Sequence, residues 1–463
     1  MKTFAPALPL TLLLGACSLA PAYVQPAAPV PQSWPQGDAY LAQSEAALPS
    51  YSYTDVFKDA RLQRLIALAL ANNRDLRVAA ANLAEARAQV RVTRAAQFPE
   101  VAVGGSASID NDGAKNYALQ GGISAFELDL FGRLRNATAA QRDTALASEA
   151  SARAVRLGLV ADLASAWATY ASDKDLLAIA QDTAESAQRS VELTKLRLDG
   201  GVAPRTDLRQ AEQVLATAQG DLAQQKAALA EDVNLMRLLA GAEVDPALLP
   251  GGLQEVLGSV ETLPAGTGSE ILLRRPDVVE AEYALRSANA NIGVARAELF
   301  PKITLTGLLG FASDALGSLF KSGSFFANAG ADASYAIFDG GAARGNVAVS
   351  EARKDAAVAT YEKAIQTAFR EVSDALATYG TIADRQKAAA QNTEAAADTA
   401  RLTDARYRGG IDSFLNSLDA QRSLYNARQA EVAITLIAVQ NRITLYRVLG
   451  GDRELAGAQP SGS

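Results

Sequence analysis

Apolar and polar residues alternate along four short segments of the chain, at about residues 99–110, 116–129, 301–313 and 325–338. The third segment has the clearest pattern, because the apolar Ile303 and Leu305 alternate with the polar Lys302, Thr304 and Thr306. A period of two predicts β-strands with one apolar and one polar face. Each segment runs about ten residues or slightly more, which is the length of a tilted membrane strand.

Soluble hairpins over a core would give the same alternation, but the flanking helices are too long and their side chains too small to cover four apolar faces. Four strands cannot close a membrane barrel, because the smallest bacterial barrels have about eight. The barrel is therefore expected to be shared between subunits. Side chains fill an eight-stranded lumen, so three chains is the smaller workable number for a conducting barrel. The sequence itself does not count subunits.

The rest of the chain predicts very long helices. Residues 135–199 contain no proline and only Gly158 as a breaker, which gives a rod of roughly 100 Å at about 1.5 Å per residue. Residues 344–408 repeat this pattern, and apolar residues three and four apart form a stripe for lateral packing. The rods turn at the pairs Gly200-Gly201 and Gly409-Gly410, and shorter helices return through 206–240 and 413–449.

The whole pattern occurs twice, since Phe98-Pro99 recurs as Phe300-Pro301 and Gly200-Gly201 recurs as Gly409-Gly410. The expected fold is mainly α with membrane strands, built by internal duplication. We divide the chain into a signal peptide, a lipid-anchored extended tether, a first repeat, a linker, a second repeat and a tail, at 1–16, 17–50, 51–252, 253–270, 271–452 and 453–463.

The N-terminus carries a targeting signal. A short apolar stretch at 8–14 precedes Leu14-Gly15-Ala16-Cys17, which resembles the lipobox of bacterial lipoproteins, where the peptide is cut before an acylated Cys. The alternative is an ordinary secretory peptide with an incidental Cys. Six prolines between residues 20 and 50 predict an extended segment after Cys17.

Composition excludes several classes of function. The chain has 463 residues with no His and a single Cys, and it contains no recognisable catalytic motif, so we do not expect an enzyme. The net charge is −7 with no basic run, which argues against a nucleic-acid partner. No later stretch offers about eighteen uninterrupted apolar residues, so no transmembrane helix is predicted.

Several motifs resemble those of the outer-membrane efflux factors of the TolC and OprM type. The strongest are Arg406-Tyr407-Arg408-Gly409-Gly410-Ile411-Asp412-Ser413-Phe414-Leu415 and Leu418-Asp419-Ala420-Gln421-Arg422-Ser423-Leu424-Tyr425. The segments 126–133, 337–341 and 272–301 resemble the family's strand-to-helix junctions and its block before the second repeat. The resemblance covers residues 50 to 452, and with the lipobox the nearest branch is the NodT-like lipoprotein group.

The resemblance implies a homotrimer whose strands form one twelve-stranded β-barrel in the outer membrane of a Gram-negative cell, continued by an α-helical barrel across the periplasm. Such a protein is a passive exit duct of a tripartite efflux system. Its partners would be a periplasmic adaptor, an inner-membrane pump of the RND type and outer-membrane lipids. The covalent lipid on Cys17 takes the place of any cofactor.

The resemblance also assigns roles to residues at the helical turns. Asp412 and Asp419 match acidic gate positions, and Asn416 falls where a further aspartate occurs in TolC-like proteins. Tyr407 matches a tyrosine that ties neighbouring helices shut, and Arg408 beside it is an expected ion-pair partner. The turns at Gly200, Gly201, Gly409 and Gly410 match the surface that docks adaptor hairpins. Asp412 could instead cap the helix that starts near Ser413.

Two alternatives come from other classes of protein. A structural coiled-coil lipoprotein without transport activity would account for the helices and Cys17, but it leaves four alternating strands unexplained. A soluble periplasmic adaptor would have one helical hairpin and no second copy.

Overall fold

The computed structural model describes residues 18–40, 51–263, 268–450 and 452, which belong to two compact units. The unit that we call the sheet unit contains the described residues of Met1–Ala27, Asn82–Glu149 and Glu280–Glu362. The core unit contains those of Ala28–Ala81, Ala150–Val279 and Lys363–Ser463. Each unit therefore draws on both halves of the duplicated chain.

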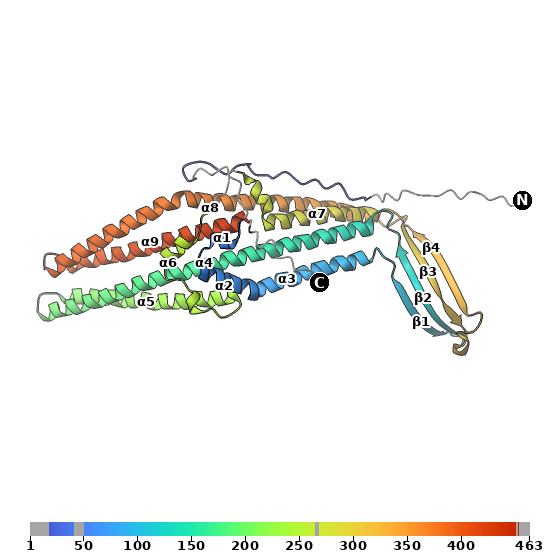
Figure 1. The fold of residues 1–463 in the computed structure, drawn as a ribbon, viewed down its shortest axis with the longest axis horizontal. Coiled ribbons are helices and arrows are strands. Elements are labelled where there is room, and N and C mark those ends of the chain that lie inside the picture. The colour runs from blue at the N-terminus through green and yellow to red at the C-terminus, as the bar shows by residue number, and fades with distance from the viewer. Residues whose placement is uncertain (1–17, 41–50, 264–267, 451, 453–463) are drawn as a thin grey trace. The chain divides into compact units, whose positions relative to one another are not determined.

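The sheet unit contains one antiparallel sheet of four strands in the order β1-β2-β3-β4 (Figure 1). The strands are β1 (Val101–Ile109), β2 (Lys115–Glu127), β3 (Lys302–Ser313) and β4 (Phe325–Ser334), and a short helical turn, η3 (Leu316–Ser318), lies between the last two. β2 and β3 are central, so β1 and β4 each have one edge without a partner strand in the described chain. The four strands lie at the four places where the sequence alternates.

β4 ends earlier than the sequence pattern predicts. Alternation continues to residue 338, but the strand ends at Ser334, opposite Lys302. The reason is that β3 begins at Lys302, so no described strand lies beside residues 335–338. A bulge between Ile123 and Phe126 places Ala125 at φ 57°, an uncommon backbone conformation for a residue with a side chain.

The sheet is largely uncovered in the described chain. All nine residues of β1 are exposed, and the apolar Val101, Val103 and Ile109 are 72%, 79% and 68% exposed. Isolated apolar residues are common on soluble surfaces, but a whole strand face is not. The alternating residues of β1 thus have no covering layer within one chain.

Two helices at equivalent places in the repeat differ in burial. α7 (Pro276–Ala297) buries Leu285, Ile292 and Ala295 among others, whereas α3 (Arg74–Ala95) has no buried residue over its 22 positions. Because both helices precede a strand of the sheet, the difference does not come from their place in the chain order. Within the described chain, the side chains of α7 are therefore covered by other residues to a greater extent than those of α3.

The segment after the predicted lipidation site is extended, as its prolines indicate, and it is held by specific contacts. Asn289 on α7 donates a hydrogen bond of 2.8 Å to the carbonyl oxygen of Pro21, and the guanidinium of Arg286 lies 4.9 Å from the centre of the Tyr23 ring. Ser18 donates a 2.9 Å hydrogen bond to Asn136. The prediction of a tether did not include these contacts. Cys17 itself lies outside the described residues.

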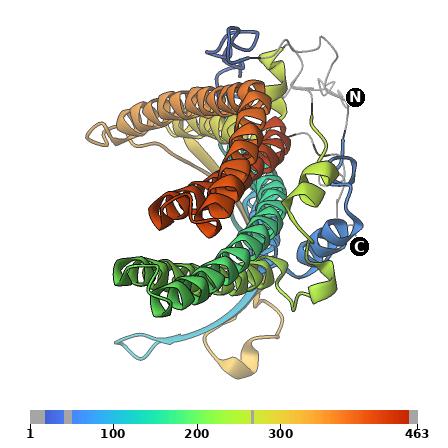
Figure 2. The same ribbon diagram turned by 90° about the vertical axis from the view of Figure 1, so that its left-hand side faces the viewer.

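The two longest helices have the same length, and so do the two helices that follow them. α4 (Arg133–Asp199) and α8 (Ala342–Arg408) each have 67 residues, and α5 (Arg205–Ala240) and α9 (Phe414–Leu449) each have 36. This equality agrees with the predicted duplication. In the core unit, the ends of these helices form two hairpins that lie side by side, α4–α5 in green and α8–α9 in orange to red (Figure 2).

The core unit buries one main apolar cluster. Its largest fully buried side chains include Trp167, Leu163, Met236 and Tyr446, which come from α4, α5 and α9. The remaining elements of this unit are short: α1 (Tyr53–Val56), α2 (Ala60–Asn72), η1 (Pro246–Leu248), α6 (Leu253–Ser259) and η2 (Ser269–Arg274). α2 and α6 contribute Leu65, Ile66 and Val256 to the same cluster.

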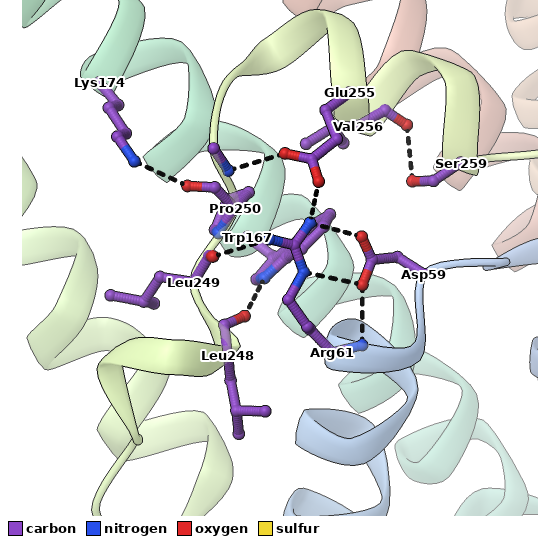
Figure 3. Close-up of polar contacts among 11 residues, drawn as sticks. Asp59, Arg61, Trp167, Lys174, Leu248, Leu249, Pro250, Glu255, Val256 and Ser259 are labelled. Atoms are coloured by element: carbon purple, nitrogen blue, oxygen red, sulfur yellow. Dashed lines mark hydrogen bonds and ion pairs between the residues drawn. The ribbon is translucent and has the colours of Figure 1, made fainter.

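The segment 245–259, which leads from the first repeat into the linker, contacts this cluster through polar groups (Figure 3). Trp167 donates a 2.9 Å hydrogen bond to the carbonyl oxygen of Leu248, and Lys174 donates one of 3.2 Å to Pro250. The Arg61 guanidinium lies between the carboxylates of Asp59 and Glu255, and it holds the pKa of Asp59 below its usual range. This segment is therefore part of the core unit.

Among the described residues, α9 is the one helix whose length and composition would suit a membrane span. Its most apolar window has a mean hydropathy of 1.2, and half of that window is buried inside the protein. Burial of that extent is typical of a core helix, and α9 contributes Val439, Ile443 and Tyr446 to the main cluster.

Candidate functional site

The turns of the two hairpins share one backbone geometry. In the first, the amide of Val202 donates to the carbonyl of Arg197 and that of Gly201 to Leu198, and Gly201 has φ 74°. In the second, Gly410 has φ 75° and the corresponding amides are those of Ile411 and Gly410. This is the Schellman pattern of helix C-termini, in which a left-handed residue satisfies the last carbonyls. The glycine pairs thus end the two long helices for the same local reason.

Apolar side chains are exposed on and beside both turns. Val202 is 69% exposed and Ile411 is 70% exposed, at matching positions directly after the two glycine pairs. Leu196 on α4 and Leu415 on α9 are also exposed. Apolar residues that gather in this way at two equivalent turns form a surface suited to contact with another protein.

Tyr407 joins the two hairpins. Its ring is 5% exposed and packs in a small apolar cluster with Phe414, Leu418 and Ala211, which come from both hairpins. The Arg197 guanidinium on α4 lies 4.6 Å from the centre of the Tyr407 ring and donates a 2.9 Å hydrogen bond to the Tyr407 carbonyl oxygen. The hydroxyl of Tyr407 is buried and has no hydrogen-bond partner in the described chain. The connection is therefore made by the ring and the backbone.

Asp412 organises the start of α9. Its carboxylate accepts hydrogen bonds from the Asn416 side chain and from the Ser413 amide, and it lies 3.2 Å from Nε of Arg406. The Asn416 hydrogen bond, followed by that of Arg406, holds the pKa of Asp412 below its usual value of 3.8. The N-cap of α9 is Ser413, whose hydroxyl accepts from the Asn416 amide, so Asp412 is not the cap residue itself.

The other predicted gate residues have different surroundings. Arg408 does not pair with Tyr407 or Asp412; its Nε lies 2.9 Å from Asp404, one turn earlier on α8. The geometry of the turn brings Arg406 to Asp412 instead. Asp419 is exposed on α9 and forms no ion pair or hydrogen bond with Asp412 among the described residues. The structure therefore brings Tyr407 and Asp412 to the end of the hairpins but leaves Asp419 separate.

A cavity of about 500 Å³ lies between the hairpins, lined by residues of α4, α5 and α9. On its wall the Tyr425 hydroxyl of α9 donates a 3.0 Å hydrogen bond to Asp221 of α5. Burial and the Asp221 carboxylate raise the pKa of Tyr425 to about 12, so the hydroxyl keeps its proton. Arg428 of α9 approaches Asp182 of α4 to 3.9 Å. These are further contacts between the hairpins above their turns.

Sequence reasoning missed Arg197, Arg406 and the pair Tyr425–Asp221. Arg197 and Tyr407 lie in different halves of the chain, and no local pattern connects them. A comparison of the two repeats aligned on their glycine pairs would have placed Arg197 and Arg406 at the same distance before the turn. That alignment is the one signal that could have singled them out.

Comparison with known proteins finds one family and several relatives whose sequences are similar to this chain. The sequence profile of a family described as outer membrane efflux protein matches residues 65–242 and 267–451. A probable efflux pump outer membrane protein of Pseudomonas putida, TtgC, is 40% identical over 452 residues, which cover 95% of this chain and 93% of TtgC. The outer membrane protein OprJ of Pseudomonas aeruginosa is 38% identical over 463 residues, covering 96% and 95%.

The same relationship appears in three dimensions. The open state of the MtrE outer membrane channel of Neisseria gonorrhoeae superposes with a TM-score of 0.83 at 34% identity, covering 94% of this chain and 98% of MtrE. The predicted fold class is therefore confirmed: a mainly helical chain that contributes four strands, with the fold of outer-membrane channels. TtgC and OprJ are both described as outer membrane proteins, and TtgC as that of a probable efflux pump.

Proposed function

The chain belongs to the outer membrane efflux protein family, and on that premise we propose that three copies form one passive exit duct whose narrow end is closed by the hairpin turns. The protein is an outer-membrane efflux channel component that extends into the periplasm. The subunit number, the gate, the partners and the lipid anchor are the parts that we add.

The sheet supports an assembly of several copies. Four strands are about half of the smallest bacterial barrel, and β1 and β4 both have an edge without a partner strand in the described chain. Exposed strand edges pair readily with other strands. With three copies the sheet closes as twelve strands, which leaves a lumen wider than the side-chain-filled eight-stranded case.

One observation supports placing the gate at the ends of the hairpins. The end of α8 is held to α4 by the Arg197 contacts with Tyr407, next to the Asp412–Arg406 pair. Opening a channel at this end requires the hairpins to separate, and separation would break these contacts. Three Asp412 carboxylates near one axis would repel each other unless a cation such as Arg406 shares the site.

The exposed turns support docking. Val202 and Ile411 offer matched apolar contacts beside Gly200-Gly201 and Gly409-Gly410, where a periplasmic adaptor would bind. Through the adaptor the duct would receive compounds from an inner-membrane pump of the RND type. A lipid on Cys17, which lies outside the described residues, would anchor the chain to the outer membrane. We assign no catalytic step and no cofactor beyond that lipid.

Single-channel conductance in a planar bilayer tests the proposal. Purified wild type is compared with Asp412→Ala, which releases Arg406 and Asn416, and with Asp398→Ala as a matched control, because Asp398 pairs with Arg401 on α8 away from the turn. We expect wild type to insert with a small conductance, Asp412→Ala to conduct several times more, and Asp398→Ala to match wild type.

The outcomes separate the parts of the proposal. Equal conductance of wild type and Asp412→Ala would exclude Asp412 from the gate while leaving the duct intact. If a preparation of associated copies gives no conductance step, the proposal of an exit duct is wrong. The alternative of a structural coiled-coil lipoprotein would then be favoured.

A further inference from the structure

The two hairpin loops of the described sheet differ in chemistry although they occupy equivalent places in the repeat. Loop 110–114 joins β1 to β2 and loop 314–324 joins β3 to β4, both at the strand ends opposite to those that join the long helices. The first loop reads Asp110-Asn111-Asp112-Gly113-Ala114 and has no large apolar side chain. The second carries Leu316 and Phe320, which are 67% and 69% exposed. Only the second loop therefore presents large apolar side chains at this end of the sheet.

Loop 314–324 contacts the apolar face of the sheet. In the strand register, Phe311 of β3 lies opposite Phe325 of β4 and Leu119 of β2. Directly opposed residues of neighbouring strands point to the same face, so these three apolar side chains share one face. The ring of Phe320 lies 5.3 Å from that of Phe311, centre to centre, and the ring of Phe325 lies 5.7 Å from it. The loop thus folds back onto the apolar face and not onto the polar one.

Serine side chains inside this loop bind its own backbone. The hydroxyl of Ser324 donates a 2.6 Å hydrogen bond to the carbonyl oxygen of Leu319, with the Lys321 carbonyl oxygen at 2.8 Å as a second acceptor. The hydroxyl of Ser318 donates a 2.8 Å hydrogen bond to the carbonyl oxygen of Ala315. Irregular backbone needs such internal partners wherever lipid replaces water around it. The loop therefore combines exposed apolar side chains with carbonyl groups that do not depend on water.

From these observations we propose that loop 314–324 is a lipid-binding element that lies in the outer leaflet of the outer membrane, with Leu316 and Phe320 among the ends of the acyl chains next to the headgroups. The inference rests on the proposed duct, because a membrane barrel turns its apolar face to lipid. The helices extend into the periplasm, so the opposite strand ends reach the outer leaflet. The loop continues the lipid contact of the sheet and leaves the mouth of the duct uncovered.

The charges of the loop set the depth of this contact. Asp314 and Lys321 are the two charged residues of loop 314–324, and both are exposed. A charged side chain in the hydrocarbon core is costly, but a lysine stem can lie along apolar surface while its ammonium group reaches the headgroups. Lys321 directly follows Phe320, so an interfacial position suits both side chains. The loop therefore belongs at the boundary between headgroups and acyl chains and not at the centre of the bilayer.

Spin labelling tests the position of the loop in the full-length protein, reconstituted into vesicles of phosphatidylethanolamine and phosphatidylglycerol. A nitroxide on Leu316→Cys should collide more often with oxygen, which concentrates in lipid, than with a water-soluble nickel chelate. Asn111→Cys is the matched control, because Asn111 is exposed in the other loop, and its label should favour nickel. The oxygen-to-nickel ratio should be several times higher at residue 316 than at residue 111. Labelled wild type gives the background from Cys17.

A third label on the sheet separates failure of this inference from failure of the proposed duct. Val103 lies opposite Gly121, two residues from Leu119, so it shares the apolar face, and its side chain is 79% exposed. If the label on Val103→Cys favours oxygen but that on Leu316→Cys is as open to nickel as that on Asn111→Cys, the inference is wrong and the duct stands. If the label on Val103→Cys also favours nickel, the apolar face does not meet lipid, and the proposed duct fails together with the inference.

Fluorescence quenching by brominated lipids measures the depth with a different variant. Leu316→Trp is compared with wild type, whose Trp34 and Trp167 give the background, and with Asn111→Trp. Bromine near the headgroup end of the acyl chains should quench the added fluorescence of Leu316→Trp more strongly than bromine near the chain ends, and it should quench Asn111→Trp little. Equally weak quenching of both variants would place the loop in water, as a lid over the mouth would be, and would overturn the inference. Stronger quenching of Leu316→Trp by the deep bromine would contradict the interfacial position.

Discussion

The residues that hold the hairpins together act mostly through groups that sequence patterns do not identify. Tyr407 contributes its ring and its carbonyl oxygen, while its hydroxyl is buried without a partner in the described chain. Asp412 contributes a charge that one Arg and one Asn share. A residue's type shows which interactions it is able to form, but only its neighbours decide which of them it forms.

Tyr407→Phe should leave the stability of the hairpins unchanged within about 0.5 kcal/mol, because it removes a hydroxyl that has no partner in the described chain. Arg197→Met should cost about 1–2 kcal/mol, because it removes both the ring contact and the hydrogen bond to the Tyr407 carbonyl. Thermal unfolding followed by circular dichroism compares the two variants. A loss in Tyr407→Phe as large as that in Arg197→Met would mean that the hydroxyl has a partner in the assembled protein.

Asp232 on α5 gives the core unit a dependence on pH. Burial and the neighbouring Asp173 carboxyl raise the pKa of Asp232 to about 7. The folded chain therefore keeps a proton that the unfolded chain loses near pH 4, so stability falls between about pH 4 and 7 and is level above that range. Asp232→Asn should flatten this slope and stabilise the protein by about 1 kcal/mol at pH 8, after allowance for solvent screening. Denaturant unfolding at pH 5 and pH 8 measures both values, and an unchanged slope would refute the assignment.

At the scale of elements, the turns are specified by backbone geometry. A left-handed residue ends each long helix, and glycine adopts that conformation without strain. The strands are specified by alternation, and the end of β4 by where its partner strand begins. The two long helices thus end at a left-handed glycine, and β4 ends where its partner strand β3 begins.

Gly201→Ala and Gly410→Ala should each destabilise the protein by about 1 kcal/mol, because the new Cβ is strained at positive φ. Gly220 provides the matched control, since it lies inside α5 with open space around it and an ordinary helical backbone. Gly220→Ala should stabilise by about 0.5–1 kcal/mol. Thermal unfolding in detergent compares the three variants, and a stabilised Gly201→Ala would show that the turn relaxes in solution.

At the scale of the whole molecule, one chain leaves apolar surface that its own fold does not cover. β1 is exposed along its length, and α3 has no buried residue over its 22 positions. β1 lies at one end of the strand order, and β4 lies at the other. A cyclic assembly covers both ends at once, because each copy offers the surface that the next one lacks.

Val92→Asp on α3 should weaken the association of copies without disturbing the fold of one chain, because Val92 is 63% exposed in it. Val202→Asp at the hairpin turn is the matched control, with 69% exposure, and it should leave the oligomeric state unchanged while weakening contact with an adaptor. Light scattering of the detergent-purified variants gives their mass. Full assembly of Val92→Asp would place α3 outside the interface between copies.

The fold was predictable from sequence where it depends on neighbours in the chain. Periodicity placed the four strands and the four longest helices, and the glycine pairs placed the turns, because these features depend on residues within a few positions of each other. The motif around 406–425 also led to the right family and hence to an outer-membrane efflux channel. The gate and docking roles remain predictions.

The contacts between distant residues became visible only in three dimensions. Nothing in the chain shows that Arg197 meets Tyr407, that Arg406 rather than Arg408 meets Asp412, or that the proline-rich segment lies against α7. The amino-acid sequence sets which backbone conformations have low free energy, and this preference depends on residues close together in the chain. The packing of the long helices and strands against each other decides which side chains meet. A different packing would change these partners while the local sequence pattern stayed the same.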